Sequence, residues 1–196
     1  AMDQVYSGIE APGLVAGVWV GSRGWNAVRG TTTLNGDTPV GLDLYTRIGS
    51  ITKTLTGTVI LQLIEEGRLS FEDTLSQWYP GIAGADLITI RNLGSMASGL
   101  DSYTFDESIT DQYFADPTQA WEPQELLLAG ASLPRRFDPG EGFFYSNTNL
   151  VALGLIAEQI LGKNLAEILQ ERIFTPLGMT RSSYPYGIEI PAPHWS

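Results

Sequence analysis

Ser50 and Lys53 are the residues of this sequence whose types and spacing most directly predict chemistry. They stand three residues apart at the start of residues 51–64, where apolar side chains recur with helical spacing. One turn of a helix places such side chains on the same face, so the amine and the hydroxyl are expected to meet. A serine hydroxyl becomes a nucleophile when a neighbouring base takes its proton. The pair therefore predicts a serine that is activated from one turn away.

The same two residues also have an ordinary structural interpretation. Ser50 would be the N-cap of the helix, and Lys53 an exposed lysine in its first turn. A lysine can act as a base only where burial or nearby positive charge favours its neutral form. However, the N-terminus of a helix is the positive end of its dipole, so a lysine there needs a reason. A catalytic role supplies one, and the same helix start would stabilise negative charge that develops beside Ser50.

A second candidate motif, Tyr145-Ser146-Asn147, stands directly before another apolar helical segment. In the functional interpretation, the Tyr145 phenol moves protons between nucleophile and leaving group, and the Asn147 amide holds a substrate carbonyl. In the structural interpretation, Asn147 is the N-cap of the helix and Tyr145 is a packed aromatic residue. The functional interpretation requires both side chains to face Ser50.

Length and composition indicate a globular protein and exclude several classes of partner. The 196 residues carry a formal net charge of −11 and are 43% hydrophobic. The negative charge argues against nucleic acids and anionic membrane surfaces. No apolar run approaches the ~18 residues that span a bilayer. Because cysteine is absent and His194 is the sole histidine, we expect no disulfide and no zinc site of the His/Cys kind. We also expect no cofactor.

The pattern of apolar residues predicts one strand pair followed by helices. Residues 13–20 are predicted to form a buried strand, and residues 25–34 the returning strand of a hairpin. A long helix starts near Ser50 and is expected to end at Gly67. Further helices are predicted over residues 70–78, 89–93, 124–131, 150–161 and 165–173, with Gly162 ending the fourth and a capping box of Asn164 and Glu167 starting the fifth.

Residues 101–121 combine five acidic residues with five aromatic ones and contain no lysine or arginine. This composition fits an aromatic wall or lid over a cleft. It also fits a solvated loop that is held in place by buried aromatic side chains. The sequence leaves both interpretations open.

Taken together, the motifs resemble those of the penicillin-recognising serine hydrolases, in the same order and spacing. The closest branch contains the class C β-lactamases, the D-alanyl-D-alanine carboxypeptidases and related esterases. The matching segments are Gly49-Ser50-Ile51-Thr52-Lys53, residues 62–69, residues 88–93, Ser98-Gly99-Leu100, residues 139–149 and residues 172–179. Tyr145 distinguishes this branch from relatives that have Ser-Asp-Asn at this motif.

The resemblance implies a role for each candidate residue. Ser50 would be the acylated nucleophile and Lys53 its proton acceptor. Tyr145 would be the proton shuttle, and Asn147 would orient the substrate amide. Whether Lys53 or Tyr145 is the true base stays open at this point, because the two titrations are coupled. The substrates implied are a D-alanyl-D-alanine peptide, a β-lactam or an ester, and the implied location is extracytoplasmic.

The implied fold is α/β (α+β) and resembles serine β-lactamases and DD-peptidases, with an antiparallel sheet flanked by helices and a helical lobe. Residues 1–68 would supply the first strands and the nucleophile helix, residues 69–175 the helical lobe, and residues 176–196 a return toward the sheet. After Asn147 the sequence contains no Lys-Thr-Gly or His-x-Gly, the third motif of the family. We therefore expect only the N-terminal part of the fold here, inactive by itself, with a C-terminal fragment or a dimer partner completing the sheet. The alternative function is a binding module that holds penicillin or a peptide without turnover.

Overall fold

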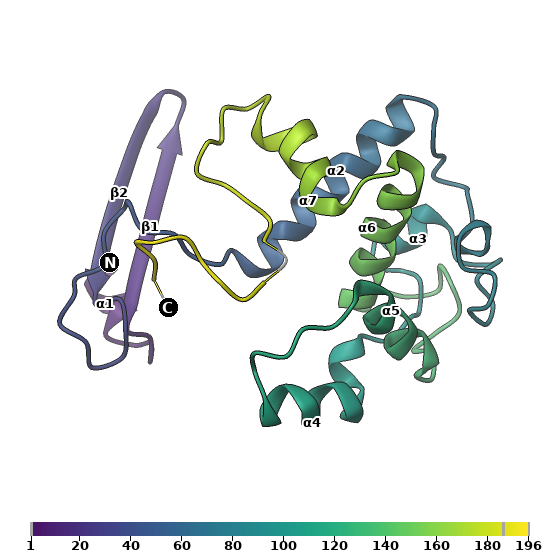
Figure 1. Ribbon diagram of the computed structural model, residues 1–196, viewed down its shortest axis with the longest axis horizontal. Helices are drawn as coiled ribbons and strands as arrows, with labels where there is room; N and C mark the ends of the chain where they lie inside the picture. The colour runs from purple at the N-terminus through teal and green to yellow at the C-terminus, as the bar shows by residue number, and fades with distance from the viewer. Residues whose placement is uncertain (1, 186, 196) are drawn as a thin grey trace. The chain divides into compact units, whose positions relative to one another are not determined.

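The computed structural model describes residues 2–185 and 187–195, which belong to two compact units (Figure 1). One unit consists of Ala1–Ile48 with Glu189–Ser196, and the other of Gly49–Ile188. The helix that begins near Ser50 and the helical segments after it therefore belong to the same unit. This division differs from the three segments 1–68, 69–175 and 176–196 expected from the sequence.

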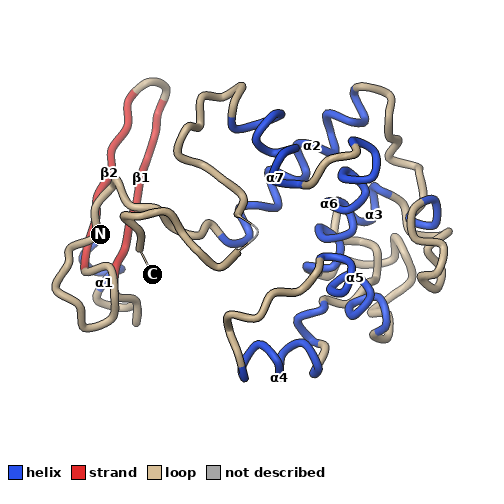
Figure 2. The backbone as a smooth tube through the Cα atoms, in the orientation of Figure 1, coloured by secondary structure: helices blue, strands red, loops and turns tan. Residues whose placement is uncertain are grey.

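The first unit is built on a β-hairpin (Figure 2). A short helix α1 (Met2–Tyr6) precedes strand β1 (Gly13–Val20), which pairs antiparallel with β2 (Arg23–Gly30). The register runs from Gly13 opposite Gly30 to Val20 opposite Arg23. The predicted hairpin is thus confirmed, although its second strand begins and ends earlier than expected.

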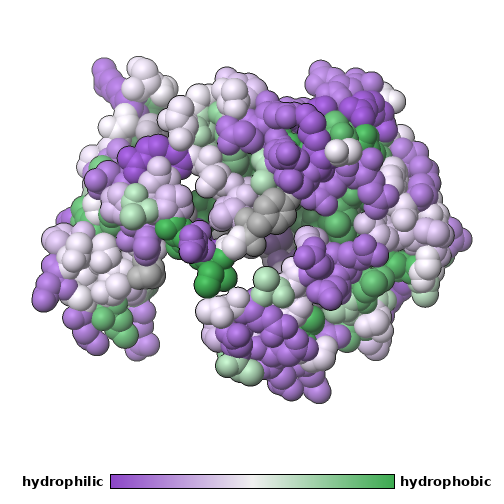
Figure 3. Space-filling view, in the orientation of Figure 1, coloured by the Kyte–Doolittle hydropathy of each residue, from purple (hydrophilic) through white to green (hydrophobic). Residues whose placement is uncertain are grey.

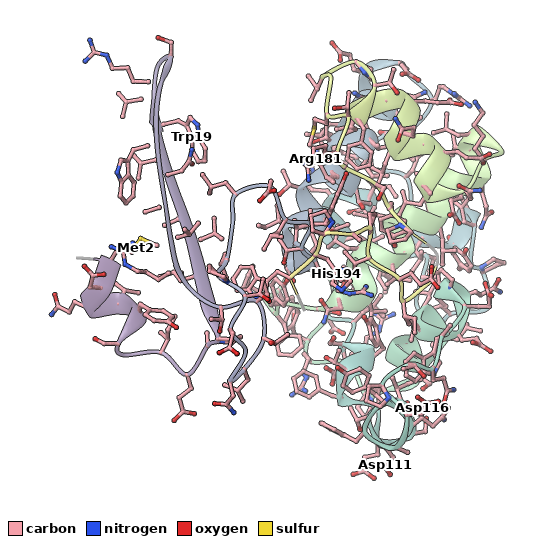
Figure 4. All side chains as sticks on the ribbon, turned by 60° about the vertical axis from the view of Figure 1, so that its left-hand side comes forward. Met2, Trp19, Asp111, Asp116, Arg181 and His194 are labelled. Atoms are coloured by element: carbon pink, nitrogen blue, oxygen red, sulfur yellow. The ribbon has the colours of Figure 1, made fainter. Side chains whose placement is uncertain are left out.

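The predicted burial of residues 13–20 is wrong. Val18 and Val20 are more than half exposed, because β2 is the one strand that pairs with β1 in the described part of the chain. The Trp19 ring lies flat against the hairpin, where a Cβ atom at Gly17 or Gly24 would collide with it (Figure 4). The glycines thus make room for an aromatic ring that partly covers the strands.

The second unit is helical, with α6 at its centre. Its helices are α2 (Thr52–Glu65), α3 (Ile90–Gly94), α4 (Glu107–Ala115), α5 (Pro123–Ser132), α6 (Asn147–Leu161) and α7 (Leu165–Leu169), with a final turn at Gln170–Phe174. None of the described helices is both long enough and apolar enough to cross a membrane. On the face drawn in Figure 3, hydrophilic side chains predominate and apolar ones form scattered groups.

Packing of α2 and α5 against α6 forms the core of this unit. Leu63 of α2, Leu127 of α5 and Leu153 of α6 are all at most 1% exposed. In α5, Gly130 lies so close to α6 that a Cβ atom would collide with the Thr148 side chain. The absence of a side chain at Gly130 therefore allows α5 to approach the first turn of α6.

Several predicted helix ends are confirmed. Thr89 forms a capping box with Asn92, and Asn164 forms one with Glu167. Gly162 ends α6 in the left-handed conformation, with φ of 68°. These signals are local, because each cap bonds a backbone group within one turn.

Other predicted boundaries are wrong. Ser146, and not Asn147, is the N-cap of α6, and Asn147 is its first residue. Residues 70–78 contain only a short 3₁₀ helix, Leu75–Gln77. Residues 107–115 form helix α4 rather than a loop, and Phe105, Tyr113 and Phe114 are exposed. The interpretation as a loop held in place by buried aromatic side chains therefore fails at these three residues. Asp111 lies in α4, and Asp116 directly follows the helix (Figure 4).

We predict that Leu153→Ala lowers the free energy of unfolding by about 2–5 kcal/mol, because it leaves a cavity where α6 meets its neighbours. The matched control is Leu128→Ala, since the Leu128 side chain is 49% exposed. Urea denaturation of the two variants and the parent protein measures both effects. Equal losses at the two positions would contradict the packing described.

Candidate active site

Ser50 lies in a single 3₁₀ turn, Gly49–Ile51, that leads directly into α2. Gly49 has φ of 52°, a left-handed conformation that residues with a side chain rarely adopt. The sharp turn leaves the Ser50 side chain exposed at the start of the helix. The expectation that Ser50 stands at a helix N-terminus is confirmed. The N-cap of α2 is Ile51 rather than Ser50, so the structural interpretation of Ser50 as an N-cap is wrong.

Lys53 lies one turn further along and contacts Ser50 directly. Its Nζ donates a hydrogen bond of 2.9 Å to Ser50 Oγ. Because both residues belong to the same helix start, their contact requires no tertiary packing. The i,i+3 spacing seen in the sequence is enough to produce it.

Tyr145 reaches the same oxygen from a distant part of the chain. Its hydroxyl donates a hydrogen bond of 2.8 Å to Ser50 Oγ across 95 residues of sequence. Lys53 Nζ lies 4.9 Å from the centroid of the Tyr145 ring. Three side chains from two segments thus converge on one hydroxyl oxygen.

This arrangement changes the acidity of the phenol. The Lys53 ammonium as a hydrogen-bonding partner, and then the Ser50 hydroxyl, hold the pKa of Tyr145 below its ordinary value of 10.0. Slight desolvation acts in the opposite direction, and the charge of Lys53 adds to the lowering. The phenolate form of Tyr145 is therefore easier to reach than in a free tyrosine.

Asn147 lies two residues beyond Tyr145, in the first turn of α6. Its Nδ2 donates a hydrogen bond of 3.2 Å to Ser102 Oγ. Tyr145 and Asn147 are therefore carried by the same helix start, as Ser50 and Lys53 are by another. The structure brings Ser50, Lys53 and Tyr145 into contact, and it ties Asn147 to Ser102.

Sequence reasoning missed the residues that hold this second helix start. Ser98 Oγ donates a 2.6 Å hydrogen bond to Asn149 Oδ1, and both residues are buried. Tyr103 is partly buried, which raises the pKa of its phenol, and the negative charges that Tyr184 and Tyr145 can carry add to the rise. The only signal in the sequence was that Ser98-Gly99-Leu100 is one of the matching motifs, directly before these residues.

No group of three or more His, Cys, Asp or Glu side chains that could hold a metal ion occurs among the residues that the structure describes. The side chains described at the site supply a hydroxyl, an amine, a phenol and an amide. A nucleophile beside an acid/base group is the arrangement used in acyl transfer.

Comparison with known proteins places the chain in a family. The family model described as Beta-lactamase matches residues 2–195, so the chain belongs to the β-lactamase family. The resemblance and the α+β fold class expected from the sequence are therefore confirmed.

Individual relatives match different shares of the chain. It is 32% identical over 143 residues to Penicillin-binding protein 4* of Bacillus subtilis, covering 69% of this chain and 29% of that protein. It is 31% identical over 174 residues to the lovastatin esterase of Penicillium rubens, and the match covers 78% of this chain and 43% of the esterase. A D-stereospecific amidohydrolase from Streptomyces sp. has a similar structure, with a TM-score of 0.80 and 32% identity. The match covers 89% of this chain and 52% of the amidohydrolase chain. The chain thus spans about half the length of that solved relative and less than half of the two curated ones.

We predict that Lys53→Gln raises the pKa of Tyr145 toward the ordinary value of a tyrosine, because the variant loses the cation that favours the phenolate. Ultraviolet titration of the protein, minus the same titration of Tyr145→Phe, isolates this phenol. The same difference is then measured in the Lys53→Gln background.

Lys163→Gln is the matched control, since it removes an equal charge beyond the other end of α6, where Lys163 pairs with Glu171. A helix of 15 residues is about 22 Å long, well beyond the screening length of about 10 Å in ordinary buffer. The control should leave the midpoint of Tyr145 unchanged. If Lys53→Gln also leaves the titration midpoint of Tyr145 unchanged, Lys53 is not the cause of the lowered pKa.

Proposed function

We propose that the intact protein is a serine acyl hydrolase in which Ser50 forms an ester with the acyl group of the substrate. The observation that carries the proposal is that Ser50 Oγ accepts hydrogen bonds from both Lys53 Nζ and the Tyr145 hydroxyl. An N-cap or a surface serine has no need of two such partners. A nucleophilic serine needs both partners, because one group must take its proton during attack and a second must stabilise the group that takes it.

In the first half of the reaction, Tyr145 acts as phenolate and Lys53 as ammonium. The phenolate takes the Ser50 proton as Ser50 Oγ attacks the substrate carbonyl, and the carbonyl π electrons move to its oxygen. When the tetrahedral intermediate collapses, the bond to the leaving amine or alcohol breaks, and Tyr145 gives it the proton. The lowered pKa of Tyr145 supports its role as base, with Lys53 as the cation that stabilises the phenolate.

The second half repeats these steps with water. Tyr145, again as phenolate, takes a proton from water, and the resulting hydroxide adds to the ester carbonyl. Collapse releases the acid and returns the proton to Ser50 Oγ. The free N–H groups and dipole at the start of α2 lie next to the charge that develops in both halves.

We infer that peptides and lactams are the substrates, with a D-alanyl-D-alanine carboxypeptidase-like activity first and β-lactamase or esterase activity second. The names of the relatives support this order: one is a penicillin-binding protein, and a solved relative is a D-stereospecific amidohydrolase. The lovastatin esterase supports the esterase alternative. An extracytoplasmic location, inactivity of residues 1–196 alone, and a fragment or second copy that completes the sheet stay predictions.

We predict that a penicillin or an activated ester labels Ser50 in the intact protein. Intact mass before and after exposure should show one added acyl group, and peptide mapping should place it on the peptide that contains Ser50. Ser50→Ala should remove the adduct. The control Ser95→Ala should keep it, because Ser95 Oγ bonds only a carbonyl of its own helix, that of Arg91.

Two outcomes would contradict the proposal. If the intact protein forms no ester with either reagent, the binding module without turnover is the better description. If the adduct persists in Ser50→Ala, another residue is the nucleophile. Turnover of the ester, followed as release of acid, then separates a hydrolase from a protein that is only acylated.

A further inference from the structure

The start of α6 is capped by residues that lie about 45 positions earlier in the chain. Ser146 is the N-cap, yet its side chain makes no cap hydrogen bond to the helix. Its Oγ instead donates to the backbone oxygen of Asp101, at 3.0 Å, and Ser146 is fully buried. The first-turn N–H groups of α6 therefore need another acceptor.

Ser102 supplies that acceptor. Its Oγ accepts hydrogen bonds from the backbone N of Asn147 at 3.3 Å and from Asn147 Nδ2 at 3.2 Å. The next pair continues the pattern, since the backbone N of Tyr103 donates to Thr148 Oγ1 at 3.0 Å. Residues 101, 102 and 103 thus bond residues 146, 147 and 148 in order.

The geometry around Ser102 fixes the direction of each of its hydrogen bonds. Ser102 is 1% exposed, and its Oγ also lies 2.8 Å from Thr104 Oγ1. A hydroxyl has one proton and two lone pairs. Because Asn147 fills both lone pairs as a donor, the Ser102 proton goes to Thr104. This leaves Asn147 with Nδ2 turned toward Ser102, Oδ1 turned away, and one Nδ2 hydrogen still available.

We propose that Ser102 is a positioning residue that holds the Asn147 amide in the orientation needed to donate to a carbonyl of the substrate. The proposal rests on the proposed function and narrows its substrate class. A free Nδ2 hydrogen recognises an amide carbonyl beside the bond that is cleaved, as in an N-acylated amino acid or peptide. An acetyl ester has no such carbonyl and gains nothing from Asn147.

The test compares two substrates that share a leaving group, N-acetyl-D-alanine p-nitrophenyl ester and p-nitrophenyl acetate. The ratio of their kcat/KM values measures how much recognition of the substrate's amide carbonyl contributes to stabilising the transition state. In the intact protein, Ser102→Ala should lower this ratio roughly threefold to tenfold, the loss expected for one neutral hydrogen bond. The rate with the acetyl ester should stay within about twofold of the parent.

A double-mutant cycle separates positioning from general loss of structure. If Ser102 acts through Asn147, then Ser102→Ala should not change the ratio further in an Asn147→Ala background. Ser98→Ala is the matched control, because it also removes a buried hydroxyl, one that bonds Asn149 rather than Asn147. We expect it to lower the melting temperature and to leave the ratio unchanged.

Ser102→Cys keeps the size of the side chain and replaces the oxygen with a weak acceptor, so it serves if the alanine variant does not fold. It should also lower the ratio. An unchanged ratio in a folded Ser102 variant, or equal losses with and without Asn147, would overturn the proposal while Ser50 acylation stands. Absence of any reaction in the parent protein would overturn the proposed function, and this inference with it.

Discussion

The site depends on one hydroxyl oxygen with two partners, Ser50 Oγ with Lys53 and Tyr145. The contact between Lys53 and Ser50 requires only the first turn at the start of α2. The Tyr145 contact joins residues 95 positions apart, so it survives only while α6 is held against α2. Burial of Leu63 and Leu153 stabilises that packing. The core of the helical unit is therefore what brings the phenol to the serine, and the reaction proposed for Ser50 depends on it.

The electrostatics of the site follow from the same contact. A lysine in the first turn of a helix is unfavourable next to the helix dipole, and an exposed lysine would gain nothing there. Beside Tyr145 it acquires a partner, because the cation favours the phenolate and lowers the pKa of the phenol. The role of Tyr145 therefore depends on the presence of Lys53 beside it. We propose a division of labour in which Lys53 supplies positive charge and Tyr145 transfers the proton.

The sequence predicted the features of the molecule that interactions within one helical turn determine. Ser50 and Lys53 meet because of helical spacing, and the ends of α6 and α7 follow from Gly162 and the capping box of Asn164. Of the two interpretations of Asn147, the N-cap is wrong, because Ser146 holds that position and the group that satisfies the Asn147 N–H is Ser102, 45 residues away. No local pattern distinguishes a serine that caps its own helix from one that caps another. The burial predicted for β1 was wrong for a related reason. Burial of a strand depends on the neighbouring strands that cover it, and the apolar residues of β1 alone do not determine it.

We propose that Ser50, Lys53 and Tyr145 act as one unit. The most direct test is the rate of acylation by one reagent in the intact protein, in Lys53→Gln, in Tyr145→Phe and in the double variant. Loss of a positioned acid/base group costs about 10²–10⁴ in rate. If the two residues serve a single proton transfer, the double variant should be about as slow as the slower single variant, because removing either one already disables the unit. Losses that multiply in the double variant would show that Lys53 and Tyr145 act independently and would contradict the account.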